Sequence, residues 1–241
     1  MRTFVLIAGV AGLLSAVSLH AEPAPTVQTL LAKHAEAVGP VDRIQTRRVK
    51  LRITGMAPFE LPAVVEASRP NLIRKDVSIQ GTPQVTAFDG KQAWKTDPFV
   101  AGGDKPAPLP AAEARQLQEE ADFDGALVKP EAKGIRVAYV GPATLNGKNT
   151  YELRVTLPDG AVQNVWLDAA TYLETKRTQT MPLGGTMQTV ETWSSDYRAV
   201  QGVKLAYRLE SGVAGAPQKA TIVVDSVEFN PRIDKARFAQ P

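Results

Sequence analysis

The sequence predicts an α+β, mainly β fold, in which one large antiparallel sheet carries two helices. Three observations support this prediction. Many short segments alternate apolar and polar residues with a period of two, turn dipeptides separate several of them, and only two segments show helical periodicity. Strict alternation is typical of antiparallel strands that have one buried and one solvated face.

The first predicted helix covers Val27–Val38. Its apolar residues fall at helical spacing, Thr26 precedes it as an N-cap, and Gly39-Pro40 ends it. A second helix is expected over Ala111–Phe123, with a narrow apolar face that includes Leu117. A sheet with one apolar face must be covered, so we expect both helices to pack on that face.

The remaining pattern predicts about eleven or twelve strands. Asp89-Gly90, Asn146-Gly147 and Asp159-Gly160 are dipeptides that tolerate the positive φ angles of a type I′ hairpin. The Pro- and Gly-rich segment 97–110 interrupts the alternation and is expected to form a loop. The predicted strands are 47–57, 60–69, 71–80, 83–88, 91–96, 134–145, 148–157, 161–168, 171–181, 185–197, 203–212 and 217–229.

The N-terminal segment has the pattern of a secretory signal peptide. A basic start is followed by the apolar stretch 4–14, and Ala21 precedes an acidic, proline-rich tract. We expect cleavage after Ala21 and a single mature domain, residues 22–241, outside the cytoplasm. The alternative is an uncleaved membrane anchor, although the apolar stretch is shorter than the roughly 20 residues that a membrane span needs.

Composition and motifs exclude several function classes. The chain has no cysteine, two histidines and a net charge of +3, so thiol catalysis, disulfides, most zinc sites and nucleic-acid binding are not expected. No nucleophile elbow, phosphate loop or dinucleotide fingerprint is present. We therefore predict a protein that is not an enzyme and has no cofactor or metal, with His34 in a structural role. A hydrolase that relies on carboxylates alone remains an alternative.

Two charged patterns have both a structural and a functional interpretation. Asp122 and Asp124 lack the further ligands of a calcium loop, so a solvated helix end is expected. Arg47-Arg48-x-Lys50-x-Arg52 is the densest positive stretch. Its alternation with Val49 and Leu51 favours the solvated face of a strand over an anion site.

A curved sheet with few helices can enclose an apolar cavity, the usual form of a small-molecule or lipid site. Core packing is the alternative role for each aromatic candidate. With Leu117 from the second helix, the candidate lining residues are Trp94, Phe99, Phe123, Trp166, Trp193 and Tyr207.

Four segments, in this order, resemble the LolA-like outer-membrane lipoprotein-sorting proteins: Phe88–Trp94, Val165–Leu173, Ser195–Lys204 and Asn230–Pro241. The resemblance covers nearly all of the mature chain, although Leu205-Ala206 stands where a proline is expected. It implies an unclosed half-barrel and a helical lid, here 97–123, over a cavity for acyl chains. The family's best-known carrier holds its lid shut with an arginine, which no residue here matches by motif.

The resemblance implies a carrier of lipoproteins or other acylated lipids in the periplasm, which we expect to be a monomer. Its transient partners would be an inner-membrane donor and an outer-membrane acceptor. Each CH₂ group exposed to water costs about 0.8 kcal/mol, so acyl chains need a shield to cross an aqueous compartment. The alternative is a sensor of envelope stress that has the same fold and binds a protein partner.

Overall fold

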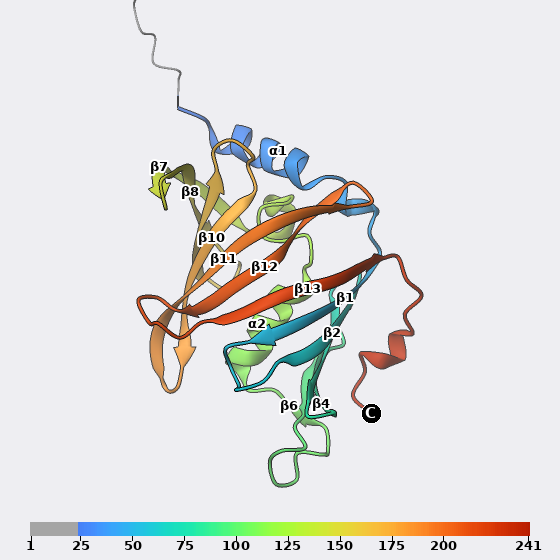
Figure 1. Cartoon of the computed structure of the whole chain (residues 1–241). Coiled ribbons are helices and arrows are strands. Elements are labelled where there is room, and N and C mark those ends of the chain that lie inside the picture. The colour runs from blue at the N-terminus through green and yellow to red at the C-terminus, as the bar shows by residue number, and fades with distance from the viewer. Residues whose placement is uncertain (1–23) are drawn as a thin grey trace, which may run out of the picture.

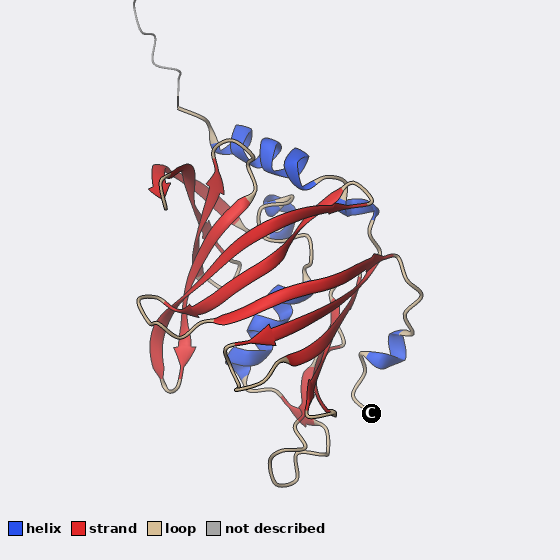
Figure 2. Cartoon of the chain, viewed as in Figure 1, coloured by secondary structure: helices blue, strands red, loops and turns tan. Residues whose placement is uncertain are grey.

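The computed structural model describes residues 24–241, so the signal peptide expected at 1–21 lies outside the described residues. It contains one 13-stranded antiparallel sheet with the helices α1 (Val27–Val38) and α2 (Ala111–Ala121), as Figure 1 and Figure 2 show. The strands are β1 (Thr46–Thr54), β2 (Leu61–Ser68), β3 (Leu72–Ile79), β4 (Thr82–Phe88), β5 (Ala93–Thr96), β6 (Ala107–Pro108), β7 (Arg136–Leu145), β8 (Lys148–Thr156), β9 (Val162–Asp168), β10 (Glu174–Leu183), β11 (Thr186–Val200), β12 (Val203–Val213) and β13 (Ala220–Phe229). Three short 3-10 turns, η1 (Val41–Arg43), η2 (Pro130–Lys133) and η3 (Lys235–Arg237), complete the described elements.

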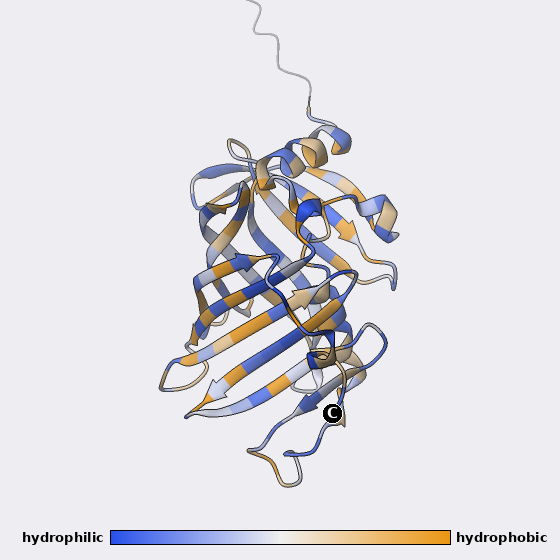
Figure 3. Ribbon diagram, turned by 90° about the vertical axis from the view of Figure 1, so that its right-hand side faces the viewer, coloured by the Kyte–Doolittle hydropathy of each residue, from blue (hydrophilic) through white to orange (hydrophobic). Residues whose placement is uncertain are grey.

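The sheet is built from two meanders. Strands β1–β6 form one arm and β7–β13 the other, and the order is β6-β5-β4-β3-β2-β1-β13-β12-β11-β10-β9-β8-β7. The arms join where β1 pairs with β13, so the first and last long strands meet in the middle of the sheet. Apolar and polar residues alternate along the strands, as Figure 3 shows, which is the pattern that predicted them.

Helix α1 has the bounds that its capping residues predict. The Thr26 hydroxyl accepts a hydrogen bond from the backbone N–H of Thr29 at 3.1 Å. Leu30 is fully buried in a cluster with residues of β8 and β9. Gly39 has φ +95°, and a Cβ at this position would collide with the carbonyl group of Gly202 in the β11–β12 turn. Only glycine therefore lets the helix end directly against that turn.

The strand prediction needed one addition. The 97–110 segment, expected to be a loop, contains the two-residue strand β6, which pairs with Trp94 and Lys95 of β5 and brings the total to 13. Two consecutive residues are too few to show a period of two, so the sequence pattern missed this strand.

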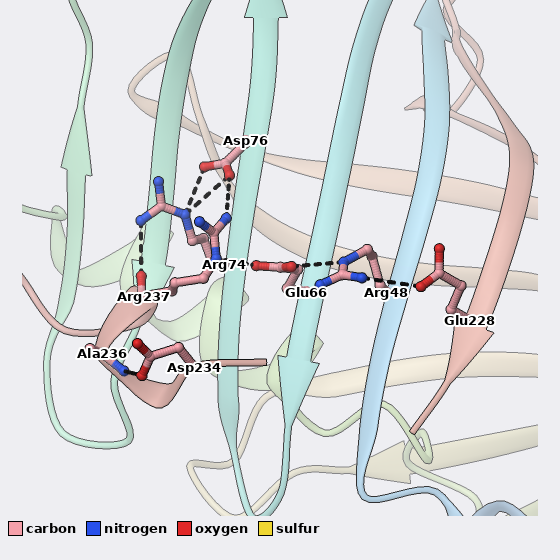
Figure 4. Close-up of polar contacts among 8 residues, drawn as sticks. All are labelled: Arg48, Glu66, Arg74, Asp76, Glu228, Asp234, Ala236 and Arg237. Atoms are coloured by element: carbon pink, nitrogen blue, oxygen red, sulfur yellow. Dashed lines mark hydrogen bonds and ion pairs between the residues drawn. The ribbon is translucent and has the colours of Figure 1, made fainter. Parts of the chain in front are cut away.

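The chain end covers the face of the sheet opposite α2. Phe238 is fully buried there, and its carbonyl oxygen accepts a hydrogen bond from Trp94 Nε1 at 2.8 Å. Nearby, the buried carboxylate of Glu66 accepts hydrogen bonds from Arg48 and Arg237, in the charged network of Figure 4. Burial acts to raise the pKa of Glu66, but these two guanidinium groups outweigh it and lower the pKa.

We expect Phe238→Ala to lower the free energy of unfolding by about 3–5 kcal/mol, because it leaves a cavity over Trp94 and removes a fully buried ring. Urea denaturation followed by tryptophan fluorescence measures this loss. Phe99→Ala is the matched control, since Phe99 is 51% exposed, and its effect should stay within about 0.5 kcal/mol. Equal losses for the two variants would contradict the assigned role of the chain end.

Candidate functional site

The sheet curves around α2, and we call the face that carries α1 and α2 the concave face (Figure 1). Cross-strand register identifies its residues, because directly paired residues of an antiparallel ladder point to the same side. Ile73 and Phe88 pair with each other and contact α2, and Ile73 pairs with Ala67, which pairs with Arg47 of β1. The odd-numbered residues of β1 therefore lie on the concave face.

Helix α2 packs on the first arm through its narrow apolar face. Leu117 and Ala121 are buried in a cluster with residues of β3, β4 and β5. Lys75 of β3 forms an ion pair with Glu120 at 2.7 Å, so a charged contact flanks the apolar one. The sequence predicted this face correctly, but the helix ends at Ala121 and not at Phe123.

Polar groups connect α2 to the second arm. The Glu119 carboxylate accepts hydrogen bonds from the side-chain amides of Gln163 in β9, at 3.0 Å, and Gln179 in β10, at 3.4 Å. Arg115 forms an ion pair with Asp159 in the β8–β9 turn at 2.9 Å. Burial raises the pKa of Glu119. Helix α2 thus bridges the concave face from β3–β5 to β8–β10.

Large aliphatic side chains lie on the concave face between these two anchor points. In the register, Leu51 pairs with Val224 and Ile53 pairs with Ile222. Ile222 also pairs with Leu209. All five side chains are only half-buried, although they lie on β1, β12 and β13 in the middle of the sheet. We call these five residues the aliphatic stripe; it is the apolar surface that the helices leave partly uncovered.

The two hollows described below differ from the enclosed apolar cavity that the sequence suggested. Two surface hollows of about 400 and 290 Å³ occur among residues 24–241, and α2 lines neither of them. The first is bordered by Lys148 and Asp168 at hairpin ends, and the second by polar side chains such as Asn164 and Thr178. A site for an apolar ligand would therefore be the partly covered aliphatic stripe and not either hollow.

Three of the aromatic and apolar residues proposed from the sequence lie on the concave face. Leu117 belongs to the contact between α2 and the first arm. Phe123 follows α2 and packs partly buried against the cluster that includes Phe229. Tyr207 is buried and shares its face with Leu209, two residues further along β12.

The tryptophans lie on the opposite face, which we call the outer face. Trp94 is buried under the chain end. Lys176 Nζ lies 4.6 Å from the centroid of the Trp193 ring and 5.5 Å from that of Trp166. Lys176 also forms an ion pair with Glu191 at 2.8 Å. These indole rings lie on the face opposite α2 and do not border the aliphatic stripe.

Phe99, another of the residues proposed from the sequence, is exposed in the loop between β5 and β6. This loop and the β1–β2 and β10–β11 turns lie at the end of the sheet away from α1 (Figure 1). They carry most of the large exposed apolar side chains: Met56, Phe59, Phe99, Val100, Leu183 and Met187. We call this loop and these two turns, with their exposed apolar side chains, the apolar rim.

Arg69 connects the segment after α2 to the segment after α1, a role that sequence reasoning missed. Its guanidinium group donates to both Asp124 carboxylate oxygens, at 2.6 and 2.8 Å. It also donates to the carbonyl oxygens of Ile44 at 2.7 Å and Val41 at 3.0 Å. The prediction of a solvated Asp124 was wrong, because this carboxylate is 11% exposed and paired. Arg69 and Asp124 are 55 residues apart, so no local pattern connects them.

The basic stretch on β1 divides between the two faces. Arg48 and Arg52 lie on the outer face and pair with Glu66 and Asp225, as expected for a solvated face. Arg47 lies on the concave face instead, so the expectation of a solvated face was wrong for this residue. The reason is its position in the alternation, which groups it with Val49 and Leu51.

His34 has a structural environment. It is buried on α1, and its Nδ1–H donates to the carbonyl oxygen of Tyr172 at 2.8 Å. Burial lowers its pKa, so the neutral ring is favoured. Within residues 24–241 no three acidic or histidine side chains gather as a metal site. In the same part of the chain, no helix has the length and apolar character to cross a membrane.

The fold has known structural counterparts. At 13% sequence identity, a LolA superfamily protein from Nitrosomonas europaea matches with a TM-score of 0.61, covering 90% of this chain and 98% of its own. The chain has a LolA-like fold. A DUF1329 family protein from Desulfovibrio piger matches at 11% identity with a TM-score of 0.63, over 89% of this chain and 97% of its own.

A third structure carries a lipoprotein-sorting description. It is a putative outer membrane lipoprotein-sorting protein domain from Vibrio parahaemolyticus, at 11% identity with a TM-score of 0.58, over 88% of this chain and 95% of its own. No model of a known protein family and no curated protein matches the sequence. The likeness is therefore one of architecture.

We expect Arg69→Met to loosen α2. The variant loses the bidentate ion pair with Asp124, and the carbonyl groups of Ile44 and Val41 lose their side-chain donor. Amide hydrogen exchange in residues 111–128 should become faster, and the free energy of unfolding should fall by about 2 kcal/mol or more. Arg69→Lys should not restore the protection, since an ammonium group cannot form the bidentate pair. Arg198→Met, which breaks an exposed ion pair, is the control and should leave exchange in α2 unchanged.

Glu191 gives a pH-dependent prediction. Hydrogen bonds from Lys176 and Lys219 lower the pKa of Glu191 to about 2, from 4.5. Its stabilising contribution is therefore present above about pH 4.5 and is lost as the pH falls towards 2.

We expect Glu191→Gln to lower the free energy of unfolding at pH 7 by on the order of 3 kcal/mol, and the gap from the wild type to close near pH 2. Denaturant titrations at several pH values measure this. The more exposed Glu210→Gln is the control and should show no such dependence. A gap that stays constant with pH would contradict the assigned pairing.

Proposed function

We propose that this protein is a non-catalytic carrier or binding protein for lipoproteins or other acylated lipids in the periplasm. The observation that carries the proposal is the aliphatic stripe: large apolar side chains in the middle of a LolA-like sheet that remain half-buried under a bridging helix. In an ordinary core, side chains at the centre of a sheet are covered completely. Here they offer an acyl chain a surface from which it excludes water.

Helix α2 supports a carrier role because it can separate from the second arm, to which polar contacts hold it. Separating α2 from the second arm exchanges the Glu119 hydrogen bonds for hydrogen bonds to water, at a small net cost. Separating α2 from the first arm would expose the apolar cluster around Leu117, which costs much more. The helix, with segment 97–123 as the lid, would therefore swing on its apolar contact.

Arg69 is the residue that we propose for the latch of this lid. Its guanidinium group holds Asp124, the residue directly after the lid, against the segment between α1 and β1. The apolar rim at the other end of the sheet would contact the inner-membrane donor or outer-membrane acceptor during transfer. No nucleic acid or cofactor is involved, and the working unit is a monomer.

The direct test is to isolate the protein from a membrane-containing host and to analyse the denatured sample for acyl species by mass spectrometry. We expect bound acylated lipid, and saturable binding of a fluorescent acyl probe after delipidation. A lipid-free preparation that also fails to bind the probe would refute the proposal.

A matched pair of variants locates the site. Ile222→Asp places a charge in the aliphatic stripe, whereas Val223→Asp places it on the outer face one residue further along β13. We expect Ile222→Asp to weaken probe binding at least tenfold, because an ionised carboxylate would need to be desolvated beside the acyl chain. Val223→Asp should bind like the wild type. Thermal unfolding of both proteins shows whether either change disrupts the fold.

A further inference from the structure

Arg47 is a charged residue at an apolar position of the concave face. Its direct partners in the register are Ala67 on β2 and Phe229 on β13, and both are buried. Its guanidinium carbon lies 5.0 Å from the centroid of the Phe123 ring. Among residues 24–241, its buried Nε has no hydrogen-bond partner. One donor of this half-buried side chain on the concave face thus remains unused.

The neighbouring carboxylate does not satisfy this donor. Asp124 is held by the fork of Arg69, which lies 4.8 Å from the same Phe123 ring. The charge of Asp124 raises the pKa of Arg47, but burial has the larger effect and lowers it to about 10. Arg47 therefore keeps its charge at neutral pH. A buried charge without a hydrogen-bonded partner destabilises a fold, and such residues commonly serve a ligand.

We propose that Arg47 binds the anionic head group of a single-chain lipid, a carboxylate or a phosphate, whose acyl chain lies along the aliphatic stripe. This inference rests on the function proposed above and specifies its ligand class. A guanidinium group presents a planar fork of donors that matches either anion. The cation–π contact with Phe123 favours keeping the guanidinium group beside that ring.

The geometry suits a lipid that enters with its head group first. Arg47 and Ile53 lie on the same face of the same strand, six residues apart, a distance of about 20 Å at roughly 3.3 Å per residue. An acyl chain spans one leaflet of a bilayer, about 15 Å. With the head group at Arg47, the chain would follow Leu51 and Ile53 towards the apolar rim.

This orientation selects between the two cargo classes of the proposed function. A lipoprotein carries a folded protein at its head group, which cannot reach Arg47 beneath the lid. A free fatty acid or a lysophospholipid with a terminal phosphate can reach it. The buried guanidinium therefore favours small anionic amphiphiles as the cargo.

The test compares three ligands that share one acyl chain: palmitate, palmitoyl lysophosphatidate and the neutral hexadecanol. Each displaces a fluorescent acyl probe from the delipidated protein. We expect one or both anions to bind about 10- to 100-fold more tightly than hexadecanol, as a hydrogen bond to a charged group implies. The anion that shows this preference identifies the head group.

Arg47→Gln should abolish the preference for the anion and leave hexadecanol binding unchanged. Arg52→Gln is the matched control, because it removes the same charge from the outer face of the same strand and should keep the preference. Arg47→Lys should retain part of it, since the charge remains while the fork is lost. The melting temperature of Arg47→Gln should be equal to or higher than that of the wild type.

The outcomes separate this inference from the function on which it rests. Equal binding of the anions and hexadecanol, or an Arg47→Gln variant that keeps the preference, would overturn the role of Arg47 and leave acyl binding intact. A marked loss of thermal stability in both Arg47 variants would show that Arg47 is structural and would overturn it as well. Failure of the wild type to bind any of the three ligands would refute acyl binding itself.

Discussion

The bridge that α2 makes across the concave face is the contact on which the rest of the structure depends. Two meanders meet only where β1 pairs with β13, so the hydrogen bonds of the sheet alone do not fix how far its arms curve towards each other. Helix α2 sets that curvature by holding β3–β5 through apolar packing and β8–β10 through Glu119 and Arg115. The two sides of this bridge differ in chemistry, and therefore in how much free energy their separation costs.

The position of α2 explains why the concave face contains a partly covered stripe and not a filled core. Two helices cannot cover one whole face of 13 strands, and α2 is anchored nearer to the edges of the sheet than to its middle. The aliphatic side chains of β1, β12 and β13 consequently keep part of their surface accessible. A fully packed face would stabilise the fold more but would offer no room for an acyl chain, whereas a fully open one would bind apolar surfaces without selection.

Local sequence patterns predicted the elements well and their environments less well. The cap at Thr26 and the stop at Gly39-Pro40 fixed both ends of α1, because capping depends on neighbours in the sequence. Alternation predicted the long strands for the same reason. It assigns residues to two faces without saying which face the helices cover, so Trp94 was expected in the cavity and lies under the chain end. The ion pair between Arg69 and Asp124 is a tertiary contact and left no periodic signal.

The alternation along β1 separates Arg47 from the neighbouring basic residues. Counting by twos from Val49 and Leu51 places Arg47 on the apolar face, whereas its neighbour Arg48 falls on the solvated one. An arginine in an apolar row is a conflict between local pattern and fold, and such conflicts concentrate at functional sites. Around Phe123, the ion pairs of the described residues match Arg69 with Asp124 and leave Arg47 unmatched, so one anion would complete the balance. The proposed latch of the lid and the proposed head-group site therefore share one aromatic ring.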